Sequence, residues 1–394
     1  MSTTRSASQS LGPEDLTPED LTPEAPGRGD WAFESLEPAR ERLRLWFEFQ
    51  ALPVWCAMGM DHQGWGFHDA LDFDGHPASD LRRLRVQARQ SIVFAWAGLC
   101  GWPGPWRQAV MVGLDAVLKH FRRSDDLFRY SVAADGAVVS DTAYLYEQAF
   151  VLLMFATILR ACPEQKEIEG HARALLSRLS AFRDPGGELF ELEAPGRTTN
   201  PLMHLFESSL AWLETPGVDH GAWERLADDI AETVLGRALG PDRPFILEHY
   251  DADWGIEDDR FEISPGHQCE WGWLLLRWGR LRGTDAPLEA ARLLLNAGER
   301  GMDPQRGVLV AALDAHQRTM NPEARLWPQT ERLKLARALG DSRIALSAAK
   351  AIGRYLGSAP PGLWSERCEA DGRFRQEPSP ASSFYHIAGA ILSL

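Results

Sequence analysis

The 394-residue sequence lacks the features that mark secreted, membrane or nucleic-acid-binding proteins. Its five cysteines are scattered without a C-x-x-C pair, which disfavours a disulfide framework or a zinc finger and fits a reducing compartment. Positive charge is scarce, because 41 Lys and Arg stand against 56 Asp and Glu, giving a net charge of −15. Nucleic acids and anionic membranes require clustered Lys and Arg, so neither is an expected partner.

Long hydrophobic runs and nucleotide-binding motifs are also missing. The longest apolar stretches, such as Ala149–Leu159, fall well short of the roughly 18 residues needed to span a bilayer. The N-terminal segment has no apolar core of the kind found in signal peptides. No G-x-G-x-x-G, G-x-x-x-x-G-K-[S/T] or G-x-S-x-G motif occurs. We therefore expect a soluble, cytoplasmic protein without a nucleotide cofactor.

The first part of the chain differs in composition from the rest. Residues 1–30 repeat Pro-Glu-Asp-Leu-Thr at 13–17 and 18–22 and contain little that could form a core. This composition predicts a disordered tail. We expect residues 31–394 to form a single catalytic domain.

From Trp31 onward the hydrophobic period is helical. The segment after Asp141 is apolar on almost every side until Leu159, which is typical of a helix buried all round. About twelve helical segments follow one another, beginning near residues 36, 80, 105, 142, 165, 200, 221, 267, 285, 328, 341 and 381.

Short aromatic-rich extended elements recur between these helices. They begin at residues 67, 128, 190, 246, 307 and 364, with gaps of 61, 62, 56, 61 and 57 residues. Six units of two helices and one strand-like loop form an internal repeat, which stacks as an open solenoid or closes into a ring. An open solenoid needs a polar cap, but Phe384–Leu394 is apolar to the last residue. We therefore predict an all-α fold, an (α/α)6 barrel with short β elements in the inter-helix loops.

Polar residues at the starts of predicted inner helices are the candidates for chemistry. His204 and Glu207 form a His-x-x-Glu pair, and His267 and Glu270 form a second one. Residues three apart share one face of a helix, so each imidazole has a carboxylate beside it. Two imidazoles and two carboxylates are also a possible ligand set for iron, manganese or zinc, although we expect no metal. A third histidine, His386, follows Tyr385 near the start of the last helix.

The remaining candidates have ordinary structural interpretations as well. Arg89 lies on a predicted inner helix among apolar residues and can form a buried structural ion pair. The fifteen Trp residues can be core or can form the floor of a sugar site. The position of three histidines in the first turns of three different helices favours a functional site.

At these positions the sequence resembles the N-acylglucosamine 2-epimerase superfamily of carbohydrate isomerases and epimerases. The matching stretches occur in family order over residues 31–394: Val86–Arg89, Tyr146–Phe150, Asn200–Glu207, Pro265–Trp271, Leu326–Glu331 and Tyr385-His386. The fold of that family is the same (α/α)6 barrel that the repeat predicts. The resemblance implies aldose–ketose isomerisation or C2 epimerisation without a metal or other cofactor.

The resemblance also implies roles for individual residues. His386 would remove the proton from sugar C2 to give a cis-enediol(ate), and His267 would be its acid/base partner. Glu270 would orient His267 or hold a hydroxyl, and Arg89 would stabilise the developing oxyanion. The residues expected to hold hydroxyls or the ring face are Tyr146, Asn200, His204 and Trp327. Imidazole, with an unperturbed pKa of about 6.5, suits proton removal next to a carbonyl.

Several functions remain open from the sequence. The motifs favour interconversion of D-mannose and D-fructose by a monomer or homodimer whose partner is a monosaccharide. The alternatives are a sugar 2-epimerase acting on N-acyl hexosamines or on glucose and mannose, and an isomerase of a phosphorylated or sulfonated hexose such as mannose 6-phosphate. A phosphorylated substrate ranks second among the isomerase substrates, because no basic cluster is visible in the loops. An inverting glycoside hydrolase on the same barrel and an inactive sugar-binding protein are further alternatives.

Overall fold

The computed structural model describes residues 31–394, apart from 64, 185–186, 192–195, 241–242 and 258–260. The predicted tail, residues 1–30, lies outside the described residues. The assignment of 31–394 to a single domain stays a prediction.

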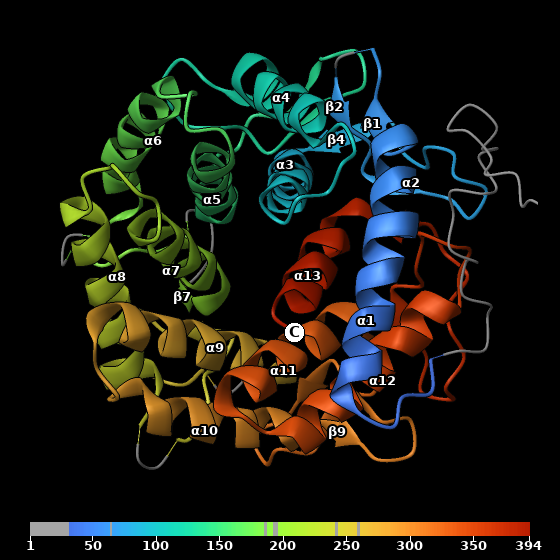
Figure 1. Ribbon diagram of the computed structural model, residues 1–394. Coiled ribbons are helices and arrows are strands. Elements are labelled where there is room, and N and C mark those ends of the chain that lie inside the picture. Colours follow the sequence, from blue (N-terminus) through green and yellow to red (C-terminus); the bar gives the residue numbers. More distant parts are fainter. Residues whose placement is uncertain (1–30, 64, 185–186, 192–195, 241–242, 258–260) are drawn as a thin grey trace, which may run out of the picture.

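Two concentric rings of helices build the described part of the chain (Figure 1). The inner ring consists of α3 (Leu84–Leu99), α5 (Leu145–Ala161), α7 (Thr199–Leu213), α9 (Pro265–Arg282), α11 (Leu326–Leu339) and α13 (Ala381–Leu392). The outer ring consists of α1 (Leu36–Trp46), α4 (Trp106–Ala116), α6 (Glu167–Arg178), α8 (Gly221–Thr233), α10 (Pro287–Glu299) and α12 (Ser342–Gly357). The predicted (α/α)6 barrel is confirmed, and its helices begin within a few residues of the predicted positions.

Three outer helices end in a wider turn. A π-helical segment follows α1, α4 and α8, at Phe47–Ala51, Val117–Phe121 and Val234–Ala238, and a 3-10 turn, Leu179–Phe182, follows α6. The first π segment leads into α2 (Leu52–Ala57), which continues the line of α1. The outer helices bury one face each, whereas nearly all of α5 is buried, as its continuous apolar sequence predicts.

The ring is closed by contacts between the first and last repeats. Helix α13 packs against α3 as well as α11. Strand β3 (Ala70–Leu71) pairs with β15 (Ser379–Pro380), and the Gln90 side chain donates to the Ala381 carbonyl oxygen at 2.7 Å. The apolar C-terminal segment is therefore buried by closure of the barrel.

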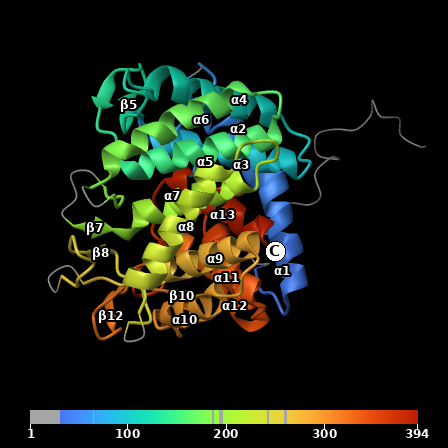
Figure 2. The ribbon, with the colours of Figure 1, turned by 90° about the vertical axis from the view of Figure 1, so that its left-hand side faces the viewer.

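Short antiparallel strands gather at one end of the barrel, opposite the C-terminus (Figure 2). Besides β3 and β15, they are β1 (Met60–Asp61), β2 (Gly66–Phe67), β4 (Leu81–Arg83), β5 (Ser131–Ala133), β6 (Val138–Ser140), β7 (Arg197–Thr198), β8 (His249–Tyr250), β9 (Met302–Asp303), β10 (Val308–Leu309), β11 (Ala312–Leu313), β12 (Thr319–Asn321), β13 (Ala324–Arg325) and β14 (Arg367–Cys368). The pairs are β1–β2, β3–β15, β4–β5–β6, β7–β8, β9–β10, β11–β12 and β13–β14. Each inner helix begins at this end, directly after a strand or loop.

A buried glutamine ties several loops to the inner helix that follows. Gln87 accepts from the backbone N–H of Phe67 and donates to its carbonyl oxygen, at 2.7 and 2.8 Å. The same two-way bond joins Gln148 to Phe128, Gln268 to Ile246 and Gln329 to Leu309. These bonds satisfy backbone groups that would otherwise be buried without partners. Because each glutamine lies 20 or 22 residues after its loop partner, the loop and the helix keep a nearly constant separation along the sequence. The bonds also fix the first turns of these inner helices.

In the described part of the chain, no helix combines the length and apolar character needed to cross a membrane.

Candidate active site

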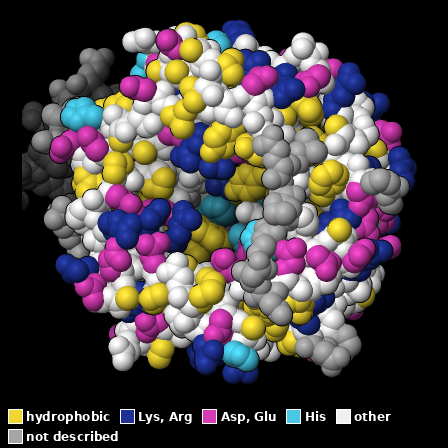
Figure 3. Space-filling model, turned by 180° about the vertical axis from the view of Figure 1, so that it is seen from behind, with side chains coloured by type: hydrophobic (Ala, Val, Ile, Leu, Met, Phe, Trp, Pro, Cys, Tyr) yellow, Lys and Arg dark blue, Asp and Glu magenta, His cyan; other side chains and the backbone are white. Residues whose placement is uncertain are grey.

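A cavity of about 720 Å³ opens at the strand end of the barrel. Small-molecule sites typically have volumes of roughly 300–1,000 Å³. Figure 3 shows it as a hollow with histidine, hydrophobic and Lys or Arg side chains around it. All six inner helices contribute to its lining. The eight predicted site residues all line this one cavity: Arg89, Tyr146, Asn200, His204, His267, Glu270, Trp327 and His386.

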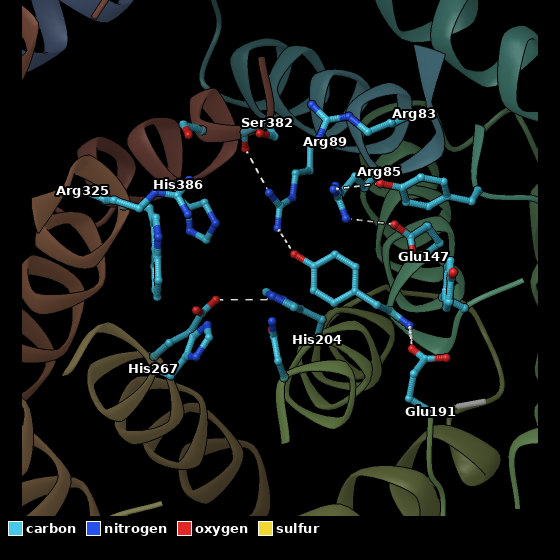
Figure 4. Close-up of a pocket in the computed structure, with 17 residues that line it drawn as sticks. Arg83, Arg85, Arg89, Glu147, Glu191, His204, His267, Arg325, Ser382 and His386 are labelled. Carbon is cyan, nitrogen blue, oxygen red and sulfur yellow. Dashed lines mark hydrogen bonds and ion pairs between the residues drawn. The ribbon is translucent and has the colours of Figure 1, made fainter. Parts of the chain in front are cut away.

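Two histidines on one side of the cavity are held by carboxylates. His267 Nδ1 lies 2.8 Å from Glu248 Oε1, and His386 Nδ1 lies 2.9 Å from Glu331 Oε1. An ionised carboxylate only accepts hydrogen bonds, so it favours the proton on Nδ1 and leaves Nε2 as a lone-pair site. Figure 4 shows both rings on the side of the cavity formed by α9 and α13.

Trp327 connects these two histidines. Its ring centroid lies 4.8 Å from that of His267 and 5.7 Å from that of His386. The indole limits rotation of both imidazoles and provides an apolar surface beside them.

Burial lowers the pKa of His386. Its pKa is held well below the usual 6.5, by burial first and then by the positive charges of Arg89 and Lys334. His386 is therefore neutral at neutral pH and can accept a proton.

The expectation that Glu270 orients His267 is wrong, because Glu248 occupies that position. Glu270 is completely buried, and neither of its carboxylate oxygens has a hydrogen-bond partner among the described residues. Burial, reinforced by the nearby Glu331, raises its pKa well above the usual value. The raised pKa favours the protonated form of Glu270, whose proton is available to an oxygen that enters the cavity.

The other His-x-x-Glu pair is satisfied within the protein. His204 Nδ1 lies 3.2 Å from Glu207 Oε2, and the Tyr385 hydroxyl donates to the other oxygen of Glu207. Although burial opposes ionisation, the hydrogen bond with His204 and the charge of Lys334 lower the pKa of Glu207 to about 2. Burial lowers the pKa of His204 to about 4, so a neutral imidazole faces an ionised carboxylate.

Arg89 projects into the cavity from α3. It donates to the Ser382 carbonyl oxygen at 3.2 Å and to the Tyr146 hydroxyl at 2.8 Å, and it lies 4.2 Å from the centroid of Phe150. These partners in the described part of the chain are neutral, so the guanidinium keeps its full charge. This charge lies between His386 and Arg85 in Figure 4.

Asn200 also lines the cavity, at the start of α7. Its side-chain oxygen is buried without a hydrogen-bond partner among the described residues. An unpartnered polar atom in this position is available to a ligand.

Sequence reasoning missed two kinds of residue in this site. Glu331 lies within the Leu326–Glu331 stretch, four residues after Trp327, so helical spacing could have placed it near the cavity. Glu248 comes from the loop before α9 and carries no comparable signal. The arginines Arg83, Arg85 and Arg325 also line the cavity. Arg83 and Arg85 are two residues apart in a basic stretch that sequence reasoning passed over, whereas Arg325 is distant in the sequence.

Two buried groups have the residue types of a metal site. His204, Glu207 and Glu270 form one, and Glu270, Glu331 and His386 form the other, with ligand atoms within 4.8 Å of one another in each. Both groups already contain neutralising partners. Lys334 Nζ lies 2.7 Å from Glu331 Oε2, while Tyr385 donates to Glu207. The internal ammonium and hydroxyl fill positions that a cation would take, so this arrangement fits a metal poorly.

Comparison with known proteins places the chain among carbohydrate isomerases and epimerases. It is 40% identical over 367 residues to the mannose-6-phosphate isomerase of Rhizobium meliloti (strain 1021), covering 89% of this chain and 95% of the relative. The fold is similar to that of a D-mannose isomerase, with a TM-score of 0.80 and 19% identity over 92% of this chain and 98% of that one. It is also similar to the cellobiose 2-epimerase of Bacillus thermoamylovorans B4167, with a TM-score of 0.79 and 16% identity over 91% of this chain and 98% of that one.

The protein is an enzyme of the isomerase class. This assignment disfavours the two further alternatives, a glycoside hydrolase and an inactive sugar-binding protein. The sequence model of N-acylglucosamine 2-epimerase (GlcNAc 2-epimerase) matches residues 66–390, and the chain belongs to this family.

Proposed function

We propose that the protein interconverts D-mannose and D-fructose units through a cis-enediol(ate), using histidine acid/base catalysis and no metal. The observation that carries this proposal is the pair of histidines, His267 and His386, each with Nδ1 on a carboxylate and Nε2 left for the substrate. Moving a proton between C1 and C2 of a sugar requires such a base and a group that stabilises the resulting oxyanion.

The first step is removal of the C2 proton. Neutral His386 takes this proton on Nε2, and the electron pair of the C–H bond moves into the C1–C2 bond as the carbonyl oxygen gains negative charge. The Arg89 guanidinium stabilises that charge more than it stabilises the neutral substrate, which lowers the barrier. Glu270, neutral and unpartnered, can donate its proton to the same group of oxygens.

The second step decides the product. Return of the proton from His386 to C1, together with transfer of the O2 hydroxyl proton to O1, yields the ketose. Protonation of the opposite face of C2 by His267 yields the 2-epimer. His204, Asn200 and Tyr146 would hold hydroxyls, and Trp327 would support the ring face.

The names of two similar proteins support mannose as the aldose. One relative is named a mannose-6-phosphate isomerase, and a protein of the same fold is named a D-mannose isomerase. Both names describe aldose–ketose isomerisation of a mannose unit, and they differ only in the group at C6.

Product identification tests the proposal. The protein is treated with EDTA, incubated with D-mannose or with mannose 6-phosphate, and the products are identified by NMR. We expect fructose or its 6-phosphate as the main product. Glucose or its 6-phosphate as the main product would instead establish a 2-epimerase, and loss of activity that returns only with added metal would contradict metal-independent catalysis.

A further inference from the structure

Four arginines line the cavity although the chain as a whole carries a net charge of −15. The proposed mechanism uses only Arg89. Figure 4 shows Arg325 beside His386, whereas Arg85 lies on the far side of the cavity, away from His267. Arg83 and Arg85 flank the start of α3. Arg83 and Arg85 are paired with Asp69 and Glu147, and the proposed mechanism gives neither guanidinium group a role.

Arg85 is positioned by a group of aromatic and acidic side chains. Its Nη1 lies 3.2 Å from Glu147 Oε1, and its Nη2 lies 3.4 Å from the Tyr130 hydroxyl. The guanidinium also lies over the rings of Tyr130 and Tyr146, at 5.5 and 5.7 Å. About a quarter of the Arg85 side chain is exposed, at 24%. It is therefore held in place while part of it remains open to the cavity.

Further groups that line the cavity can donate hydrogen bonds, whereas Glu191, which also lines it, accepts from the backbone N–H groups of Leu145 and Tyr146. Arg83 is bonded through Nε to Asp69, and its side chain is 26% exposed. Tyr130 and Tyr144 meet edge to face, with centroids 5.6 Å apart, and both line the cavity. Two arginines and two tyrosines therefore line this cavity, and Tyr130 is in contact with both Arg85 and Tyr144.

The carboxylate that faces Arg85 does not fully cancel its charge. Glu147 is only 1% exposed, and burial raises its pKa to about 7, against the opposing effect of Arg85. The uncharged form of Glu147 is therefore accessible near neutral pH. An anion bound to Arg85 would favour this protonated form further, because it repels the carboxylate charge.

These observations deepen the proposed function and rest on it. We propose that Arg85, with Arg83, Tyr130 and Tyr144, binds the phosphate of a hexose 6-phosphate whose C1 and C2 lie at His267 and His386. A phosphate monoester carries nearly two negative charges and three acceptor oxygens, which suits several donors on one wall. Guanidinium groups match such oxygens with paired N–H donors. A singly charged carboxylate would leave part of this donor set unused.

The subsite predicts a preference between two substrates that differ only at C6. We expect kcat/KM for mannose 6-phosphate to exceed that for D-mannose by at least about 100-fold, since only the phosphorylated sugar forms charge-assisted hydrogen bonds with these donors. The decisive quantity is the ratio of these two kcat/KM values, because effects on folding or on the reacting carbons change both values together.

Substitutions on opposite sides of the cavity locate the subsite. Arg85→Gln should lower the ratio by about 10- to 100-fold, and Arg85→Lys should lower it less, because lysine keeps the charge but loses the fork of donors. Arg325→Gln is the matched control inside the cavity, since Arg325 is bonded to Glu366 on the opposite side. It should leave the ratio unchanged. Arg343→Gln, on outer helix α12, should change neither kcat/KM value.

Three results would overturn the assignment. They are a wild-type ratio near or below one, an equal loss for both sugars in Arg85→Gln, and a fall of the ratio in Arg325→Gln instead of Arg85→Gln. If neither sugar is turned over, the proposed function fails. The subsite is then tested separately by calorimetric titration, which measures the affinity for each sugar. Binding of mannose 6-phosphate that weakens in Arg85→Gln supports the subsite, and equal affinity for both sugars contradicts it.

Discussion

The two His-x-x-Glu pairs have the same spacing and lie at the same end of neighbouring inner helices, yet their chemical states differ. In α7 the pair closes on itself, because His204 and Glu207 bond to each other and Tyr385 fills the other carboxylate oxygen. In α9 the pair is separated, because His267 bonds to Glu248, while Glu270 has no hydrogen-bond partner among the described residues and lies 3.9 Å from His204 Nδ1. Spacing on a helix places two side chains on one face, but groups from other elements determine whether they bond to each other.

This difference assigns the two pairs to different tasks. The α7 pair is a neutral imidazole on an ionised carboxylate, which is a stable way to present a hydrogen-bonding group. The α9 pair offers a histidine free at Nε2 and a neutral acid. The predictions below test this division, beginning with the largest expected effect.

Loss of the reacting histidines should have the largest effect on turnover. His386→Asn and His267→Asn should each lower kcat by about 100- to 10,000-fold, the usual contribution of a general acid or base. His316→Asn, at an exposed loop position, is the control and should leave kcat unchanged. Steady-state assays of the three variants provide the test. A decrease in kcat of less than fivefold for His386→Asn would show that His386 is not the catalytic base.

The two glutamates should separate stability from catalysis. Glu207→Gln removes an ionised, buried partner of His204 and Tyr385 and should cost roughly 3–5 kcal/mol in the free energy of unfolding. Glu270→Gln replaces a neutral acid by a neutral amide of the same shape and should cost less than about 1 kcal/mol. Denaturant unfolding of both variants measures the difference. Equal destabilisation by the two substitutions would indicate that Glu270 is ionised like Glu207, and would contradict the different roles given to the two glutamates.

The carboxylates that hold the histidines should act as positioning residues. Glu248→Gln and Glu331→Gln should lower kcat at least about tenfold with little change in KM, since the amide no longer fixes the imidazole tautomer. Comparison of kcat with KM distinguishes this effect from lost substrate binding. A rise in KM alone would place Glu248 or Glu331 in contact with the sugar instead.

The pH dependence of kcat/KM should reflect the titration of the buried His386. The pKa of His386 lies well below 6.5, so its neutral, active form persists as the pH falls through 6.5 and is lost only at lower pH. The acid limb of kcat/KM for D-mannose, whose own charge does not change, should therefore lie below pH 6.5. An acid limb at or above pH 6.5 would contradict a buried base.

Chelation should have the smallest effect. Because Lys334 and Tyr385 already neutralise the buried carboxylates, EDTA treatment should change kcat less than twofold. Activity assays with metal analysis before and after treatment measure this. A loss restored specifically by one divalent ion would require the two buried groups to be interpreted as metal ligands.

The regular parts of the molecule could be predicted from the sequence because they depend on local pattern. Helical periodicity gave the helices, and the spacing of the extended elements gave the six repeats, in four of which Gln87 or its counterpart ties the loop to the inner helix. The candidate residues that line the cavity were found because each lies early in an inner helix within a motif stretch. Such positions converge once the ring closes.

The remaining features depend on contacts between distant segments. The bond from Glu248 to His267 and the position of Arg85 opposite the histidines both require the closed barrel. The low pKa of Glu207 and the high pKa of Glu270 arise from burial and from neighbours on other helices. The spacing of residues in the sequence predicts neither how deeply a group is buried nor which charged side chains of other helices lie near it.

The most direct measurement of the central claim is the fate of hydrogen at C2. D-mannose and mannose 6-phosphate are turned over in D₂O by the EDTA-treated protein, and the label is located by NMR. The account predicts solvent deuterium at C1 of the ketose or C2 of the recovered aldose, and its disappearance in His386→Asn. Isomerisation in which C1 receives hydrogen only from C2, at a rate that is unchanged in His386→Asn, would contradict proton transfer by this histidine.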